Sequence, residues 1–350
     1  MHDADIVRVR LQFAGAAAIV ALLSLAALPA QSQQAAPALV PHSAWDCGMP
    51  DGIPTPEAGK LLFELQIPLD RAAEIGETQY GMRRVAVGLE GSLEGPKLSA
   101  TVTPGALDLE LTLPNGTIEI EQLLVLQTAD GSYIFARNAG TGPDDKDVRV
   151  VMDFEAPNAS DYAWLNSGRF VARRELNAGA KMLSLRVYDV AGVTANMANA
   201  IRITKPAGVP AQPWDYRSKA PTEQQGDILI RENVTLAGGQ SVGASKRGNR
   251  NIIPITGGQI SGRIAGKVLM GGADYQNLSP PATIDAHYLW QADDGEIIIV
   301  RNGGSFGSLV PTFETRIDGP YAFLNGGRYL SSNPEAGQGG VSLTFFESTD

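Results

Sequence analysis

Short runs of alternating apolar and polar residues follow one another along most of the chain. They are rich in the β-branched and aromatic residues that strands favour, as in LFELQIPL, TIEIEQLLVL, SYIFAR, LSLRVYDV and EIIIVRN. No apolar period of the helical type extends beyond about two turns, and the 39 glycines argue against long helices. The pattern therefore predicts an all-β protein with many short antiparallel strands.

The same pattern occurs twice. LLVLQTADGSYIFARNAG in the first half matches YLWQADDGEIIIVRNGG in the second, and DFEAPNASDYAWLNSGRF matches TFETRIDGPYAFLNGGRY. In each copy an Asp-Gly pair, Asp130-Gly131 or Asp294-Gly295, stands between two strand-like runs and predicts a tight hairpin. A repeat of this length predicts two similar domains.

Composition places the domain boundaries. We expect a signal peptide at 1–32, a disordered linker at 33–59, a first barrel at 60–190, a Pro-rich linker at 191–225 and a second barrel at 226–350. Short strands at this density form a sandwich or a barrel. We favour two tandem antiparallel barrels, because closure removes exposed strand edges.

The N-terminus has the features of an export signal. Arg8 and Arg10 precede the apolar stretch Leu11–Leu28, and Ala30–Ser32 offers small residues for cleavage. The stretch is also long enough to remain as an uncleaved membrane anchor. We expect cleavage and a periplasmic or secreted protein that has no membrane contact afterwards. Its single cysteine, Cys47, allows no internal disulfide, and a net charge of -10 disfavours nucleic acid as a partner.

Five motifs of the second half occur in a characteristic order. They are GGADYQ at 271–276, ADDG at 292–295, VRNGG at 300–304, TFET at 312–315 and YAFLN at 321–325. In this order they resemble the family called domain of unknown function 3237, over the whole second unit and more loosely over the first. The resemblance implies a lipocalin-like antiparallel barrel with a polar mouth. It also implies a link to the breakdown of lignin-derived aromatic dimers by cofactor-free decarboxylation.

Two residues of the second copy are candidate proton-transfer groups. Asp274 follows two glycines, and a partly buried carboxylate there would act as a general base, or else bond to backbone N–H groups as a turn aspartate. His287 is the one histidine in the sequence of the two predicted domains, and it shares a strand face with Asp285. It either shuttles protons or is a hydrogen-bonded strand residue, and alone it cannot form a histidine-type metal site.

The remaining candidate residues have a structural and a functional interpretation each. Arg301, followed by Asn302, either forms an ion pair with Glu314, repeated in the first copy around Glu155, or points into the barrel and holds a substrate carboxylate. Glu314 is an alternative proton carrier to Asp274. The other residues expected to line or close the pocket are Tyr288, Trp290, Phe313 and Tyr321.

The two copies differ at positions that matter for chemistry. Aligning Gly105 with Gly272 places Leu107 opposite Asp274 and Leu123 opposite His287. A one-residue slip would turn Asp108 to the other face of its strand. We therefore expect a working site in the second domain and a degenerate first domain, or else two drifted binding or structural modules.

Several motifs carry no function. GGSFG and GQSVG match a nucleophile-elbow pattern but lack a following helix. Asp144, Asp145 and Asp147 do not have the spacing of a calcium loop, and no nucleotide-binding motif is present. We expect neither a metal nor a cofactor.

These features lead to one main functional hypothesis. It is a cofactor-independent lyase, of the carboxy-lyase type, acting on a small aromatic or phenylpropanoid acid. The alternative is a non-catalytic periplasmic binding barrel for an apolar or aromatic molecule. A structural module is favoured if both barrels are filled by their own side chains.

Overall fold

The computed structural model describes residues 49, 51–202, 207–208, 217–337 and 339–349. The expected signal peptide, Cys47 and part of the expected Pro-rich linker lie outside these residues. Within the expected linkers, strand β1 (Ile53–Pro54) pairs with β13 (Ala200–Ile201), and a 3-10 turn, η1, covers Pro56–Ala58. Order therefore begins before position 60. Among the described residues, no helix is long and apolar enough to cross a membrane.

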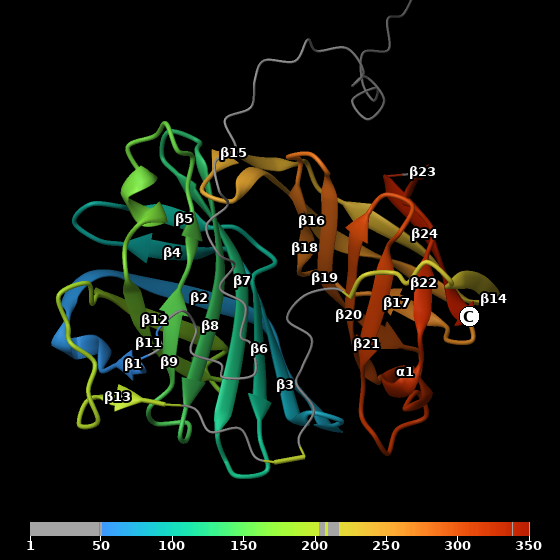
Figure 1. Cartoon of the computed structure of the whole chain (residues 1–350), viewed down its shortest axis with the longest axis horizontal. Helices are drawn as coiled ribbons and strands as arrows, with labels where there is room; N and C mark the ends of the chain where they lie inside the picture. The colour runs from blue at the N-terminus through green and yellow to red at the C-terminus, as the bar shows by residue number, and fades with distance from the viewer. Residues whose placement is uncertain (1–48, 50, 203–206, 209–216, 338, 350) are drawn as a thin grey trace, which may run out of the picture. The chain divides into compact units, whose positions relative to one another are not determined.

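The first copy, domain 1 below, forms a closed antiparallel barrel (Figure 1). In the described part of the chain, eight strands follow one another around it and the last, β7, pairs again with the first, β8. In barrel order they are β8 (Tyr133–Gly142), β9 (Arg149–Met152), β11 (Phe170–Asn177), β12 (Met182–Asp189), β2 (Lys60–Thr78), β3 (Gly81–Gly88), β6 (Leu107–Thr112) and β7 (Ile118–Thr128).

Short elements complete domain 1. Strands β4 (Gly91–Glu94) and β5 (Ala100–Val102) connect the first half of β2 to β7, β10 (Phe154–Glu155) pairs with β8, and η2 covers Ala163–Asn166. The barrel is filled by apolar side chains, among them Leu65, Leu124, Leu126 and Val187. These residues alternate with outward-facing ones along their strands, as the period of two requires.

The second copy, domain 2, repeats this order of strands. The chain of paired strands runs β21 (Val310–Glu314), β20 (Ile297–Ser305), β19 (Thr283–Ala292), β17 (Gly266–Val268), β16 (Gly248–Gly262), β14 (Gln224–Leu236), β24 (Gly340–Thr349) and β22 (Tyr329–Ser331). Three further strands attach to it, β15 (Gln240–Ser245), β18 (Ala273–Asn277) and β23 (Glu335–Gly337), and α1 covers Phe323–Gly326. A backbone hydrogen bond of 3.1 Å from Ser331 to Leu309 joins β22 to the start of β21.

The hairpins predicted from the Asp-Gly pairs are confirmed. Gly131 joins β7 to β8 with φ of 84°, and Gly295 joins β19 to β20 with φ of 95°. Both angles lie in the region that glycine adopts without strain. The prediction of an all-β chain with two similar domains is confirmed as well.

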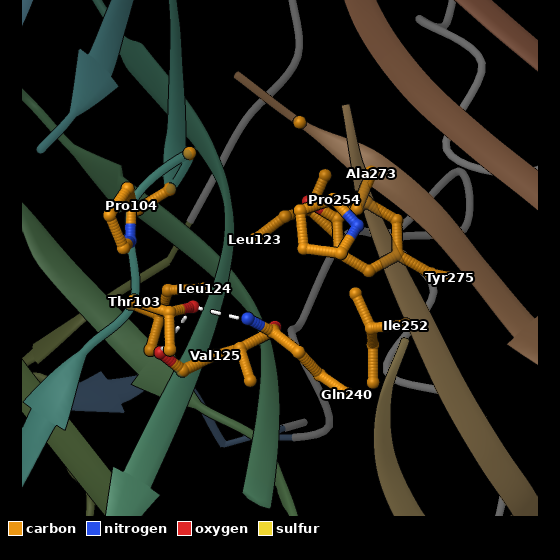
Figure 2. Close-up of a pocket in the computed structure, with 13 residues that line it drawn as sticks. Thr103, Pro104, Leu123, Leu124, Val125, Gln240, Ile252, Pro254, Ala273 and Tyr275 are labelled. Carbon is orange, nitrogen blue, oxygen red and sulfur yellow. Dashed lines mark hydrogen bonds between the residues drawn. The ribbon is translucent and has the colours of Figure 1, made fainter. Parts of the chain in front are cut away.

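The described residues belong to one compact unit, and the two domains share an apolar cluster. Domain 1 contributes Leu107, Leu123 and Phe135, and domain 2 contributes Leu289 and Tyr275, whose ring stacks on Phe135 at 5.0 Å. Figure 2 shows a gap at the edge of this cluster, where Thr103 of domain 1 faces Gln240 of domain 2. The gap measures about 10 Å³, which is at most room for one water molecule.

Candidate functional site

Strand β19 supplies side chains to two different environments. Ala286, Tyr288 and Trp290 face the interior of domain 2 and belong to its apolar core. The intervening residues Asp285 and His287 face the other way, toward domain 1. The sequence-based expectation that Asp285 and His287 share a face is confirmed, and that face lies at the contact between the domains.

A row of three inward-facing residues crosses the neighbouring strands β18, β19 and β20. Asp274 lies directly opposite Ala286, and Ala286 lies directly opposite Asn302. Directly opposed residues in an antiparallel pair point to the same face of the sheet. The candidate residues Asp274 and Asn302 are therefore on one inner surface, separated by a methyl group.

Asp274 is partly buried and has only neutral partners among the described residues. Gln276 Nε2 donates to its Oδ2 at 2.7 Å, and the backbone N–H of Asp285 donates to its Oδ1 at 3.2 Å. Burial raises the pKa of Asp274 to about 7, against the opposite effect of these two hydrogen bonds. The carboxyl group is thus able to hold or release a proton near neutral pH.

The equivalent carboxylate of domain 1 is Asp108. Asp108 lies opposite Ala86 on the preceding strand, as Asp274 lies opposite Ile253. The backbone N–H of Gly105 donates to Gly88, and that of Gly271 donates in the same way to Ile255. The alignment of Gly105 with Gly272, and the expectation that the first copy lacks this carboxylate, are therefore wrong. Counted between paired residues, the turn from Ile260 on β16 to Gly266 on β17 is one residue shorter than the turn from Leu93 on β4 to Ala100 on β5, which shifts the register of the glycines.

Asp108 nevertheless differs from Asp274 in its partners. Arg174 clamps it with two hydrogen bonds, of 2.9 Å from Nε and 2.5 Å from Nη2, and Gln122 Nε2 donates a third at 2.6 Å. All three residues are buried. Asp108 is consequently held in an ion pair, whereas Asp274 is not.

A second inward carboxyl group in domain 2, Glu232 on β14, was not among the sequence-based candidates. It is 1% exposed and accepts hydrogen bonds from the Tyr288 hydroxyl at 2.6 Å and from Trp290 Nε1 at 2.9 Å. Burial raises the pKa of Glu232 to about 7, although both hydrogen bonds lower it. The alternation of Ile230, Glu232 and Val234 was a signal that this residue faces inward.

Domain 1 has leucines where domain 2 has this cluster. Leu65 is the equivalent of Glu232, because Leu65 lies opposite Leu93 as Glu232 lies opposite Ile260. Leu124 and Leu126 are the equivalents of Tyr288 and Trp290, because they precede their Asp-Gly turn by the same number of residues. The group of Glu232, Tyr288 and Trp290 is therefore a property of domain 2 alone among the described residues.

Aromatic rings fill much of the remaining interior of domain 2. Phe313 packs against Trp290 at 5.1 Å, Tyr329 at 5.3 Å and Phe345 at 5.6 Å between ring centroids. All four rings are buried. Tyr288, Trp290 and Phe313 thus form an apolar wall beside the inward carboxyl groups.

Three other candidates, His287, Arg301 and Glu314, lie between the domains. Arg301 Nη2 donates to Glu121 of domain 1 at 3.1 Å, and its Nη1 is 3.6 Å from Glu314. Glu314 in turn accepts two hydrogen bonds from Arg83 of domain 1, of 2.8 and 2.9 Å. His287 Nε2 is 2.8 Å from Asp285.

This network is reciprocal. Glu155 of domain 1 accepts hydrogen bonds from Ser245 and Arg250 of domain 2, as Glu314 accepts them from Thr78 and Arg83. Burial alone would raise the pKa of Glu314, but the charges of Arg83 and Arg301 outweigh it and lower the pKa. The repeated Arg and Glu residues thus hold the domains together.

Tyr321 takes part in neither group. Its hydroxyl donates to Asp294 in the β19–β20 turn at 2.9 Å, and its ring covers the edge of the core. Asn325, four residues after Tyr321, accepts a hydrogen bond from the backbone N–H of Thr315 and donates one to its carbonyl oxygen. Tyr321 therefore fastens a loop to a hairpin.

In the described residues, no group of three or more His, Cys, Asp or Glu side chains is placed to hold a metal ion. The inner surface of domain 2 is instead a set of two carboxyl groups, one amide and several aromatic rings. Such a surface can exchange protons with a small molecule and pack against its apolar parts.

The fold and this surface define a two-domain β-barrel protein with a polar cluster inside its second domain. The chain belongs to the family described as "Protein of unknown function (DUF3237)", whose model matches residues 58–190 and 227–309. The resemblance seen in the sequence is confirmed.

Relatives of this chain include UPF0311 proteins of bacteria. A UPF0311 protein of Bradyrhizobium diazoefficiens is 44% identical over 74 residues, which are 21% of this chain and 45% of the relative. One of Rhodopseudomonas palustris is 43% identical over 81 residues, 23% of this chain and 53% of the relative. The chain thus spans about half the length of these curated relatives.

Solved structures that match part of this chain include two proteins without a stated reaction. A conserved protein of unknown function from Rhodopseudomonas palustris has 27% identity and a TM-score of 0.33, covering 37% of this chain and 95% of that chain. A β-barrel-like protein from Acinetobacter baumannii has 22% identity and a TM-score of 0.33, covering 37% of this chain and 94% of that chain.

Proposed function

We propose that domain 2 is a cofactor-independent acid–base catalyst for a small, largely apolar or aromatic molecule, and that its reaction is of the lyase class. Asp274 is the group that takes and returns the proton. The observation that carries the proposal is the difference between Asp274, which has neutral partners, and Asp108, which is clamped by Arg174.

The position of Asp274 suits this role. A general acid or base works best when its pKa is near the working pH, and burial raises the pKa of Asp274 to about 7. The ionised carboxylate removes a proton from an O–H or N–H of the bound molecule. The electron pair left behind breaks a neighbouring bond, and Asp274 returns the proton to the product.

Arg301, His287 and Glu314 have no substrate role in this proposal. The Arg301 guanidinium already faces Glu121 and Glu314, and no other Arg or Lys is among the buried residues described in domain 2. A substrate carboxylate would therefore find no cation inside. Tyr288, Trp290 and Phe313 supply the apolar wall.

A turnover screen tests the proposal. The mature protein is incubated with small aromatic and phenylpropanoid acids, alcohols and amides, and products are detected by mass spectrometry. Asp274→Asn should abolish formation of any product while circular dichroism shows an unchanged fold. The rate with the native protein should rise with pH through about 7, as Asp274 ionises.

Asp108→Asn is the matched control. It changes the equivalent carboxylate of domain 1 and should leave turnover in place, although it weakens the ion pair with Arg174. Equal turnover by native protein and Asp274→Asn would refute the catalytic role. Saturable binding without any product would support the alternative, a non-catalytic periplasmic binding barrel.

A further inference from the structure

In domain 1, one glutamine side chain joins the two ends of the inward row. Gln122 Nε2 donates to Asp108 Oδ2 at 2.6 Å, and Asn138 Nδ2 donates to Gln122 Oε1 at 3.3 Å. Gln122 lies directly opposite both residues in the sheet. A carboxamide thus fills the space between the carboxylate and the amide of this row.

In domain 2 neither of the two equivalent residues carries a side chain that bonds to the carboxylate of the row. Ala286 takes the place of Gln122, opposite Asp274 and Asn302. Asn333 takes the place of Arg174, because it follows Tyr329 by four residues as Arg174 follows the equivalent Phe170. The side-chain oxygen of Asn333 accepts a hydrogen bond from the backbone N–H of Gly307. Neither replacement supplies a donor to Asp274 among the contacts of the described residues.

Asn302 is left incomplete by this difference. Its side chain is buried, with 2% exposed, and Nδ2 donates to Ser331 Oγ at 3.1 Å. Its Oδ1 atom has no hydrogen-bond partner among the described residues. A buried polar atom without a partner is uncommon and calls for an explanation such as a ligand.

We propose that domain 2 binds, between Asp274 and Asn302 and against Ala286, a planar ligand group with two N–H donors, namely a primary carboxamide or an amidine. The inference rests on the proposed function for this site and adds the identity of the ligand's polar head. One N–H of the group donates to the Asp274 carboxylate and the other to Asn302 Oδ1. The size of the group follows from the carboxamide that occupies the place in domain 1.

The chemistry of the row disfavours an acidic head group. Ionised Asp274 and Asn302 Oδ1 both present acceptors, and an ionised ligand carboxylate would add a third acceptor beside them. Domain 1 satisfies Asp108 with the same kind of donor, the N–H groups of Gln122 and Arg174. The ligand head therefore replaces groups that the chain itself supplies in the other copy.

The test introduces the missing side chain. Ala286→Gln should place an amide between Asp274 and Asn302, raise Tm by about 2–4 °C through the new hydrogen bonds, and block the site. Ala286→Met is the matched control, since it has a similar volume but no amide. It should not raise Tm in the same way.

Binding is measured on the full chain with acetamide, acetamidine and acetate as probes. The readout is the side-chain N–H₂ resonance of Asn302 in a ¹⁵N-labelled protein. Acetamide or acetamidine should shift it saturably in the native protein but not in Ala286→Gln, and acetate should not shift it. The stronger of the two active probes shows whether the head group is neutral or cationic.

The inference is wrong if neither nitrogen probe produces a saturable shift, if acetate matches them, or if the shift survives in Ala286→Gln. None of these readouts depends on turnover. An inactive protein that binds acetamide or acetamidine would keep this inference and refute the proposed catalysis. A protein whose turnover requires Asp274 but which ignores both probes would do the reverse.

Discussion

Asp108 and Asp274 occupy the same position in two copies of one sheet, yet their surroundings give them different chemistry. Two N–H groups of Arg174 hold Asp108 as an ion pair. Asp274 has an amide and a backbone N–H instead, and burial raises its pKa to about 7. A buried cationic partner thus holds Asp108 in an ion pair, whereas Asp274 has only neutral partners.

Glu232 gives a prediction about the pH dependence of stability. Its folded-state pKa, raised to about 7, is above the unfolded value, so the folded protein retains the proton to higher pH. This contribution is fully present below about pH 4 and is lost as the pH rises through about 7. It amounts to a value on the order of 3 kcal/mol.

Glu232→Gln removes that titration while keeping the shape of the side chain. In urea unfolding from pH 5 to 8, the unfolding free energy of the native protein should fall with rising pH. That of the variant should fall less, by an amount on the order of 3 kcal/mol. The carboxylates between the domains, such as Glu314, have lowered pKa values and do not titrate in this range. Parallel pH profiles for the two proteins would show that Glu232 is ionised throughout.

At the scale of the element, the two faces of β19 have separate tasks. Tyr288 and Trp290 point inward to Glu232, and His287 points outward to the contact with domain 1. A shift of one residue would exchange these faces. The register of β19 is therefore a requirement of both the interior cluster and the domain contact.

Gly272 is one device that sets this register. Its φ is +74°, and a Cβ atom there would lie 1.9 Å from the carbonyl oxygen of His287 on β19. Gly272→Ala should therefore push β18 away from β19 and cost about 2–4 kcal/mol of unfolding free energy. Gly295→Ala, with φ of +95° and open space around it, should cost only about 1 kcal/mol.

Chemical denaturation of the two glycine variants checks the comparison. A loss at Gly272 no larger than that at Gly295 would mean that β18 yields easily. In that case the position of Asp274 would not depend on the close approach of the two strands.

Strands and hairpins were predictable because alternation and the Asp-Gly turns are local signals. The sequence did not predict which of Arg301 and Asn302 points into the barrel. Both faces of β20 are buried, so the pattern of apolar residues does not mark the interior face. The register around Gly271 was misjudged because one connection is a residue shorter. Asp274 was a candidate from the sequence and lies on the inner surface of domain 2, and its role stays a prediction. Glu232 was missed even though its neighbours alternate.

At the scale of the whole molecule, reciprocal ion pairs and an apolar cluster join the domains. Arg301 reaches Glu121 of domain 1, and the equivalent Arg137 lies 3.6 Å from Asp285, the counterpart of Glu121 in domain 2. Burial alone would raise the pKa of Asp285, but the charges of His287 and Arg137 lower it to about 2. The contact is therefore charged as well as apolar.

The most deeply buried of these pairs gives a prediction. The side chains of Arg83 and Glu314 are 0% and 1% exposed. Arg83→Met should cost about 3–5 kcal/mol, because it removes a partner from a buried carboxylate. The reciprocal Arg250→Met should cost less, since the Arg250 side chain is 16% exposed and its pair with Glu155 is less buried.

Urea unfolding of both variants, and of each combined with Glu314→Gln, measures the coupling. In the double variant the loss from Arg83→Met should shrink, whereas the loss from Arg250→Met should stay the same. Additive losses for Arg83 and Glu314 would show that their contact contributes little to holding the domains together.

The difference between Gln122 and Ala286 has a consequence for how such a protein can change. In an assembly of two identical subunits, one mutation alters both copies of a site at once. Here both halves are encoded in tandem, so one half can keep a filled, rigid interior while the other accumulates changes that open space. The contacts between the halves can stay matched throughout, because they lie on the opposite face of the same strands. Tandem duplication in this fold thus separates the residues that support a site from those that give it new chemistry.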